Sequence, residues 1–194
     1  HAYTAKVLTD HGEPTERGPA KASTFRPLYG GTSGTPAQMA YFKEFFAKYQ
    51  GIFAWHTELQ ERAIRTKRII TATGRQFDFP DCFRNSQGNA SAKTQIVNYP
   101  VQSVATAEIV PLGVILLCNK LKELDLRSRV INTVHDSVLI DCHPDEINII
   151  KDIGPSCLLA AQDEAQRRFG LDTFIPLAVE MSRGKNWMEQ YDFT

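Results

Sequence analysis

Apolar residues recur at helical spacing in the first third of the chain. Between residues 37 and 68 they stand at Met39, Phe42, Phe46, Tyr49, Phe53, Leu59 and Ile64. This spacing is typical of amphipathic helices, and it predicts two helices that separate near Gly51. Ahead of them, residues 1–18 predict an irregular entry with one short helix. Pro19 suits the first turn of a helix, and that helix should end at the Gly30-Gly31 pair.

The middle of the chain changes from a strand pattern to a helix pattern. Residues 69–80 (IITATGRQFDFP) predict a β-hairpin with Gly74 in its turn. A loop over residues 82–90 follows. We then expect a long helix over residues 92–124, kinked or broken at Pro100 and Pro111, because proline removes a helical hydrogen bond.

The last third returns to strands. Residues 128–146 (SRVINTVHDSVLIDCHPDE) predict two strands with a polar interruption between them. Residues 145–169 predict a helix ended by Gly170, and FIPLAVEM, which starts at Phe174, predicts a final strand. The whole pattern predicts an α+β fold, with helical subdomains and long helices first and a small antiparallel sheet in the second half.

Composition narrows the class of protein only slightly. The 194 residues make one large domain or two small ones, and 22 basic residues balance 22 acidic ones. A local basic face can still bind phosphate. The four cysteines lack CxxC spacing, which argues against a zinc site and favours a reducing compartment. Glu108 and Pro111 interrupt the longest apolar run, so we expect no membrane span. We find no signal-peptide pattern, and because the chain begins with His1, we expect it to be a piece of a longer protein.

The first candidate constellation has four members spaced four residues apart: Arg17, Lys21, Phe25 and Tyr29. On a helix this spacing aligns the side chains along one face. Two cations can hold a polyphosphate, and two aromatic rings can stack on a base. The simpler interpretation is an amphipathic helix with core aromatics and solvated cations. Spacing alone favours that interpretation.

Two further clusters are weaker evidence of a functional site when each is considered alone. His135, Asp136 and Ser137 stand between two strand patterns, where an exposed carboxylate can bind Mg²⁺ or simply form a polar turn. Adjacent residues on one strand point to alternate faces, so a Ser-His-Asp hydrolase relay is excluded. Asn98 and Gln102 place two amides on one helical face, where they can contact groove acceptors of DNA or lie on a plain helix surface.

Taken together in this order, the three clusters resemble the C-terminal part of family A DNA polymerases, the bacterial repair polymerases and many phage replicases. RGPAKASTFRPLYGG resembles the fingers-helix motif Arg-x3-Lys-x3-Phe/Tyr-x3-Tyr-Gly of that family. NYPVQS resembles its Asn-x-Pro-x-Gln motif, and VHDS its palm motif Val-His-Asp-Glu. TGRQFDFP is similar to its Gly-Arg hairpin, and VEMSRGKNWMEQ to its natural C-terminus.

The resemblance implies a DNA-templated DNA polymerase, in which the primer 3′ hydroxyl attacks the α-phosphate of a dNTP. It implies fingers over residues 1–80 and a partial palm over residues 81–194, ending at the C-terminus. Asp136 and Lys21 would be catalytic, with Asp136 as a ligand in a two-metal Mg²⁺ site whose second carboxylate lies outside this chain. The implied nucleotide-binding residues are Arg17, Lys21, Phe25 and Tyr29. The implied DNA-binding residues are Arg75, Asn98, Gln102 and His135.

The resemblance also implies partners and a location. The partners are primer-template DNA, dNTP and the rest of a polymerase of phage type: the upstream palm, the thumb and an optional 3′–5′ exonuclease domain. The location is the cytoplasm, that of a bacterial host for a phage protein, with no membrane partner.

Several positions depart from the family pattern. Arg26 and Pro27 replace a glycine and a small or apolar residue, which predicts a kinked end of the fingers helix. Ser137 replaces the usual Glu, and Thr94 stands where the family often has Arg. Two alternatives stay open. One is a phage-type single-subunit RNA polymerase, which shares the His-Asp-Ser motif but lacks the amide pair. The other is a DNA-binding subunit that has lost catalysis.

Overall fold

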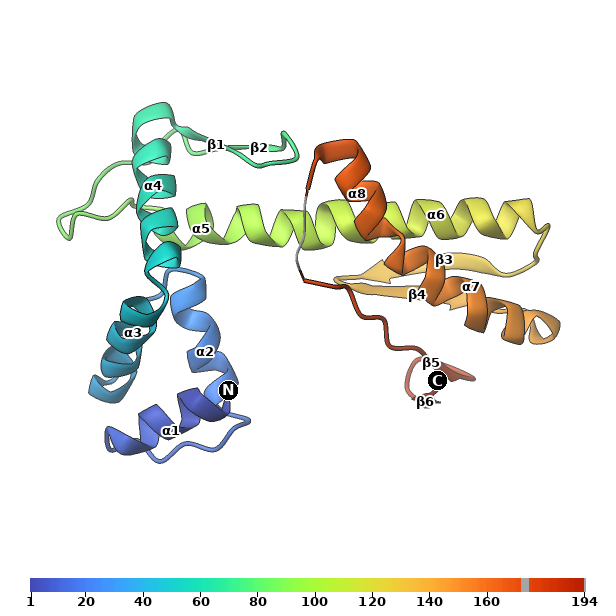
Figure 1. Ribbon diagram of the computed structural model, residues 1–194, viewed down its shortest axis with the longest axis horizontal. Helices are drawn as coiled ribbons and strands as arrows, with labels where there is room; N and C mark the ends of the chain where they lie inside the picture. The colour runs from blue at the N-terminus through green and yellow to red at the C-terminus, as the bar shows by residue number, and fades with distance from the viewer. Residues whose placement is uncertain (172–174, 194) are drawn as a thin grey trace. The chain divides into compact units, whose positions relative to one another are not determined.

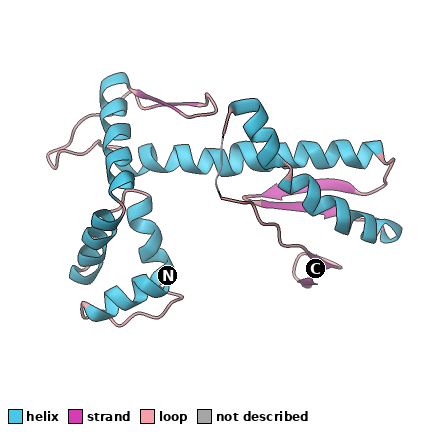
Figure 2. Cartoon of the chain, viewed as in Figure 1, coloured by secondary structure: helices cyan, strands magenta, loops and turns pink. Residues whose placement is uncertain are grey.

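The computed structural model describes residues 1–171 and 175–193 (Figure 1). The helical elements are α1 (Ala2–Asp10), α2 (Ala20–Leu28), α3 (Pro36–Lys48), α4 (Gln50–Thr66), α5 (Lys93–Gln102), η1 (Ser103–Ile109), α6 (Val110–Glu123), η2 (Pro144–Glu146), α7 (Ile147–Leu159) and α8 (Ala161–Phe169). The strands are β1 (Arg68–Ile70), β2 (Gln76–Asp78), β3 (Arg129–Val134), β4 (Ser137–Asp141), β5 (Ser182–Gly184) and β6 (Gln190–Asp192). They form antiparallel pairs, seen in magenta in Figure 2. The predicted α+β class is confirmed.

The chain divides into two compact units, residues 1–101 and 102–194. Each unit packs around its own apolar clusters. The division describes packing, so the functional boundary between fingers and palm at residues 80 and 81 stays a prediction.

The first cluster of unit 1 joins α1 to α3. Its buried members are Val7, Leu8, Ala37, Tyr41, Phe42 and Phe45. Helix α3 begins with a capping box, in which the Thr35 hydroxyl accepts the backbone N–H of Gln38 and the Gln38 side chain accepts that of Thr35. The break between α3 and α4 falls at Tyr49, two residues before the predicted Gly51, which lies inside α4.

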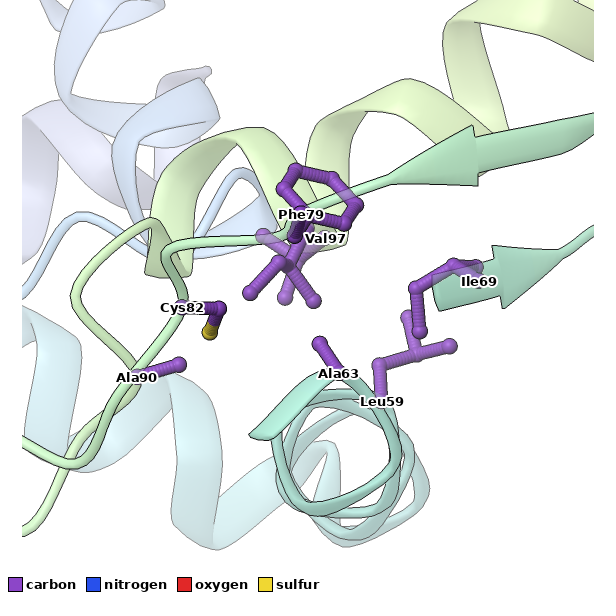
Figure 3. Packing of buried hydrophobic residues seen from close by; sticks show 8 residues of the cluster. Leu59, Ala63, Ile69, Phe79, Cys82, Ala90 and Val97 are labelled. Atoms are coloured by element: carbon purple, nitrogen blue, oxygen red, sulfur yellow. The ribbon is translucent and has the colours of Figure 1, made fainter. Parts of the chain in front are cut away.

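The second cluster of unit 1 holds α5 against α4 and the β1–β2 hairpin (Figure 3). Its buried members are Leu59, Ala63, Ile69, Phe79, Cys82, Ala90, Ile96 and Val97. The hairpin itself was predicted, and Gly74 occupies the expected turn with a positive φ of 84°. This cluster fixes the part of α5 that carries Asn98.

The predicted long helix is present, and it does not break at its prolines. Residues 93–123 stay helical, and the π-helical segment η1 absorbs the irregularity between Pro100 and Pro111. Pro111 is the second residue of α6, directly after η1. By length and composition alone this helix could cross a membrane. That is weak evidence, because core helices of soluble proteins pass the same test.

Unit 2 packs α6 against α7 and the β3–β4 hairpin. The buried members of this cluster are Leu117, Leu121, Leu126 and Ile150. Both predicted strands are present, and Val134 pairs with Ser137, so His135 and Asp136 form a two-residue turn. The hairpin therefore presents this dipeptide at its tip.

Two predictions for the last third were wrong. The helix expected over residues 145–169 is interrupted at Ala160, because α7 packs on the Leu117 cluster whereas α8 buries Ala161 and Ala165 against Leu112. Gly170 does end α8, with a φ of 65°. The strand expected from Phe174 is absent over the described residues 175–181. The Leu177 N–H there donates to the Gln162 side chain at 3.1 Å, in place of a neighbouring strand. Phe174 lies outside the described residues.

Candidate functional site

The C-terminal end of α2 is a Schellman motif. The Gly31 N–H donates to the Arg26 carbonyl at 2.8 Å, and the Gly30 N–H donates to the Pro27 carbonyl at 3.2 Å. Gly30 takes a φ of 77°, a left-handed conformation that only glycine adopts without strain. The sequence Pro27-Leu28-Tyr29-Gly30-Gly31 therefore ends the helix sharply, one residue after its internal proline.

Gly30 also sets the approach of α2 to α5. A Cβ atom at this position would lie 2.9 Å from Cγ2 of Val97, a distance that real Cβ atoms essentially never show. Val97 is fully buried in the α4–α5 cluster, so it cannot move aside easily. The absent side chain at Gly30 thus lets the end of α2 lie directly on α5.

His56 of α4 contacts the same end of α2. Its ring hydrogen-bonds the Leu28 backbone, while burial lowers the pKa of the imidazole below its usual value. The side chain is 3% exposed, and its Nε2 atom has no hydrogen-bond partner among the described residues. Through its bond to Leu28, His56 holds the last turn of α2 in place.

A groove of about 480 Å³ lies between α2 and α5. Among the residues lining it are Phe25, Arg26, Tyr29, Thr94, Gln95 and Asn98. The rings of Phe25 and Tyr29 stack along one side, with centroids 6.2 Å apart and planes inclined by 21°. Phe25 is 37% exposed, so its ring is available to a ligand and does not fill the core.

Asn98 gives the groove an unsatisfied acceptor. Its Oδ1 atom is buried and has no hydrogen-bond partner in the described part of the chain. An orphaned buried carbonyl is unfavourable unless a ligand or water supplies an N–H or O–H donor. The groove is therefore lined by an aromatic wall and an amide residue, and the aromatic wall suits stacking on a planar ring.

The predicted cations lie outside this lining. Lys21 is exposed in the first turn of α2, and Arg17 is exposed in the turn before it. The prediction that all four residues share one helix is thus wrong for Arg17, because α2 begins only at Ala20. The cations belong to the N-terminal side of α2, and the aromatic pair belongs to its C-terminal end.

The predicted metal ligand stands at the tip of the β3–β4 hairpin. His135 and Asp136 are both exposed there, and His135 adopts a left-handed φ of 56°. No cluster of three or more His, Cys, Asp or Glu side chains suited to a metal occurs among the described residues. One exposed carboxylate fits Mg²⁺, which takes one or two protein carboxylates and completes its shell with water and phosphate.

The remaining predicted DNA contacts are distributed over two elements. Arg75 is exposed beside Gly74 in the β1–β2 turn, where its backbone N–H donates to the Thr71 hydroxyl at 3.1 Å. Gln102 is exposed on α5, four residues after Asn98. Of the predicted site residues, the groove brings together Phe25, Tyr29 and Asn98.

Sequence reasoning missed some residues of this site. Thr94 and Gln95 line the groove about one helical turn before Asn98; Gln95 was missed, and Thr94, like Arg26, was noted only as a departure from a family pattern, although its spacing to Asn98 was a signal. His56 gave no signal, because a buried histidine follows from packing alone.

Comparisons with known proteins identify the fold and the family of the chain. The fold resembles that of the POL domain of Pol1 from M. smegmatis, solved in complex with DNA primer-template and dNTP. The TM-score is 0.67 and the sequence identity is 22%, covering 83% of this chain and 31% of that one. A polymerase-type fold is thus the class that the structure defines.

The family follows from sequence. Residues 1–189 match the model of DNA polymerase family A, and the chain belongs to that family. It is 30% identical to DNA polymerase I of Caldicellulosiruptor bescii over 91% of this chain and 21% of that protein. It is 26% identical to the DNA polymerase of Bacillus phage SP01 over 79% of this chain and 17% of that protein. The chain therefore spans about a fifth of the length of these relatives.

Proposed function

We propose that this chain forms the fingers and part of the palm of a DNA-templated DNA polymerase, with fingers over residues 1–80 and palm over residues 81–194. The reaction is transfer of a nucleotide from dNTP to a primer 3′ hydroxyl. The observation that carries the proposal is the groove, which the stacked Phe25 and Tyr29 rings line together with Asn98. Membership of DNA polymerase family A supports it.

Helix α2 serves the incoming nucleotide in this proposal. Arg17 and Lys21 bind the triphosphate and neutralise the charge that develops on it. Phe25 packs against the sugar and base of the dNTP. Tyr29 lies next to the templating base. The exposed positions of both cations and the stacked geometry of the rings suit these roles.

The DNA contacts come from three other elements. Asn98 and Gln102 of α5, His135 of the hairpin tip and Arg75 of the β1–β2 turn bind primer or template. Minor-groove acceptors differ little between base pairs, so donors such as the side-chain amide N–H groups of Asn98 and Gln102 can bind them whatever the sequence. A replicative enzyme needs that tolerance.

Asp136 is the proposed metal ligand of this chain, and a second carboxylate comes from outside it. Mg²⁺ bound there would stabilise the attacking and leaving oxygens. The hairpin supports this role because its two-residue turn exposes the carboxylate and leaves its oxygens accessible. The proposed partners are primer-template DNA, dNTP and the rest of the polymerase, in the cytoplasm.

The test is Asp136→Ala in the complete enzyme. We expect incorporation to be abolished and primer-template binding to stay close to normal, because the carboxylate holds metal and not DNA. Asp141→Ala at the other end of β4 removes an equally exposed carboxylate of the same hairpin and should leave activity near normal. A mutant at position 136 that keeps kcat within tenfold, about 1.4 kcal/mol in barrier, contradicts the metal role.

The same assay separates the alternatives. Extension with dNTP but not with NTP supports a DNA polymerase, whereas preference for NTP indicates the RNA polymerase. A complete protein that binds primer-template without extending it is a non-catalytic subunit.

A further inference from the structure

Arg26 shares the groove with the aromatic pair. It follows Phe25 on α2, is exposed, and lines the same cavity as Tyr29 and Asn98. Its place beside a stacking surface calls for an explanation.

One hydrogen bond orients the Arg26 side chain without using all of its donors. Its Nη1 donates to Oε1 of Gln38 at 2.9 Å, and the same oxygen takes part in the capping box of α3. A guanidinium has five N–H donors, so this tether leaves most of them for a ligand. Gln38 therefore restrains the orientation of Arg26 at little cost to its binding capacity.

Arg26 and Lys21 serve different anions. Five helical residues correspond to a rise of about 7.5 Å and a rotation of about 140°. Side chains so displaced point to different sides of α2 and cannot converge on one phosphate group. If Lys21 binds the triphosphate, the guanidinium meets another phosphate, close to the base that Tyr29 and Asn98 receive.

We propose that Arg26 binds a backbone phosphate of the template strand, beside the templating base held in the groove. This inference rests on the proposed function, since it names the part of the DNA that the groove receives. Arg26 thus adds one ionic contact to template binding and no contact to dNTP. Arginine suits the role because its planar fork matches two phosphate oxygens at once.

The test compares Arg26→Gln and Arg26→Lys in the complete enzyme. Affinity for a primer-template is measured from about 50 to 200 mM salt. Removing one phosphate contact should reduce the slope of log K against log salt by roughly 0.7 to 0.9, and Arg26→Lys should keep the slope. The KM for dNTP should stay within about twofold, because the contact is to the template.

Two controls separate charge from structure. Arg65→Gln removes an exposed arginine of α4 and should leave the slope unchanged. Gln38→Ala removes the tether without removing charge, so it too should leave the slope unchanged. If Gln38→Ala lowers the slope as much as Arg26→Gln does, Arg26 acts only through folding and the proposal fails.

Two other outcomes overturn the inference. One is an unchanged salt slope in Arg26→Gln. The other is a raised KM for dNTP with normal template binding, which moves Arg26 to the nucleotide. Both presuppose a wild-type enzyme that extends primers. A wild-type protein that does not extend them contradicts the proposed function itself, so the two failures are distinguishable.

Discussion

The groove of unit 1 and the hairpin tip of unit 2 differ in how their candidate functional residues are brought together. The groove unites α2 and α5, segments far apart in sequence, through the Gly30–Val97 contact and the His56 support. The tip consists of two adjacent residues, His135 and Asp136, exposed by a short turn. A binding surface for a base needs several side chains at fixed separations. A lone carboxylate needs only exposure, so a turn suffices.

The largest effect within the groove concerns Phe25. If Phe25 packs against the dNTP sugar as proposed, a tyrosine hydroxyl at this position would fill the space and the hydrogen-bonding role left by a missing 3′ hydroxyl, which a phenyl edge does not. Phe25→Tyr should therefore relax discrimination against dideoxynucleotides by about 30- to 1000-fold, or ~2–4 kcal/mol. Competition between dNTP and ddNTP in single-nucleotide extension measures the ratio. Equal slowing of both nucleotides would make Phe25 a merely structural residue.

Lys21 tests whether the nucleotide site extends beyond the groove lining. A charge-assisted hydrogen bond to phosphate in a closed site contributes on the order of 2–3 kcal/mol. Lys21→Ala should lower kcat/KM for dNTP by roughly 30- to 150-fold. Lys43→Ala, an exposed lysine of α3, serves as the control. Weakened DNA affinity with a normal dependence on dNTP would instead assign Lys21 to the template.

Gly30 tests the long-range contact that builds the groove. Gly30→Ala combines a left-handed φ with a clash against Val97, whereas Gly74→Ala has a similar φ of 84° and nothing within 4 Å. We expect a loss of about 1 kcal/mol for Gly74→Ala and about 2–3 kcal/mol for Gly30→Ala, measured by urea unfolding.

A double variant tests whether the additional loss of stability in Gly30→Ala comes from the clash with Val97. Val97→Ala removes the clashing methyl, so adding it to Gly30→Ala should cost less than it does in the wild type. Equal losses at Gly30 and Gly74 would show that α2 does not depend on close approach to α5.

The smallest effect concerns the base of the hairpin in unit 2. Burial opposes ionisation of Glu146, but the Ser128 hydroxyl and the backbone N–H groups of Arg127 and Ser128 donate to its carboxylate and lower its pKa to about 2. Because the folded-state pKa is depressed, this stability is complete above the unfolded value of about 4.5. It is lost as pH falls from there through about 2.

Glu146→Gln should lower the Tm at pH 7 by a few degrees and flatten the pH dependence of the Tm between about pH 4.5 and 2. Asp145→Asn, its exposed neighbour, is the matched control. A pH profile that is unchanged in Glu146→Gln would mean that other carboxylates govern acid unfolding. Activity should respond less than in the groove variants, because Glu146 of η2 binds Ser128, just before β3, at the end of the hairpin opposite its tip.

Short-range sequence patterns were sufficient to predict individual helices and turns of the fold. Pro19 and Gly30 bracketed α2, Gly74 marked the β1–β2 turn, and the polar residues between two apolar runs placed Asp136 at a hairpin tip. Each of these depends on backbone preferences of a few neighbouring residues, which the sequence carries directly. The same preferences overstated the effect of Pro100 and Pro111, because a π-helical segment can absorb what proline removes from the ladder.

The sequence by itself determined which residues carry charge, rings and amides, and on which elements they stand. Only the tertiary structure decided which of them meet. Asn98 lines one groove with Phe25 and Tyr29 because Gly30 leaves room for Val97 where α2 meets α5. Residues 175–181 do not form a strand. A strand needs hydrogen-bond partners for its backbone groups, and at Leu177 the partner is the Gln162 side chain of α8. Contacts between distant segments depend on packing, and no local pattern encodes them.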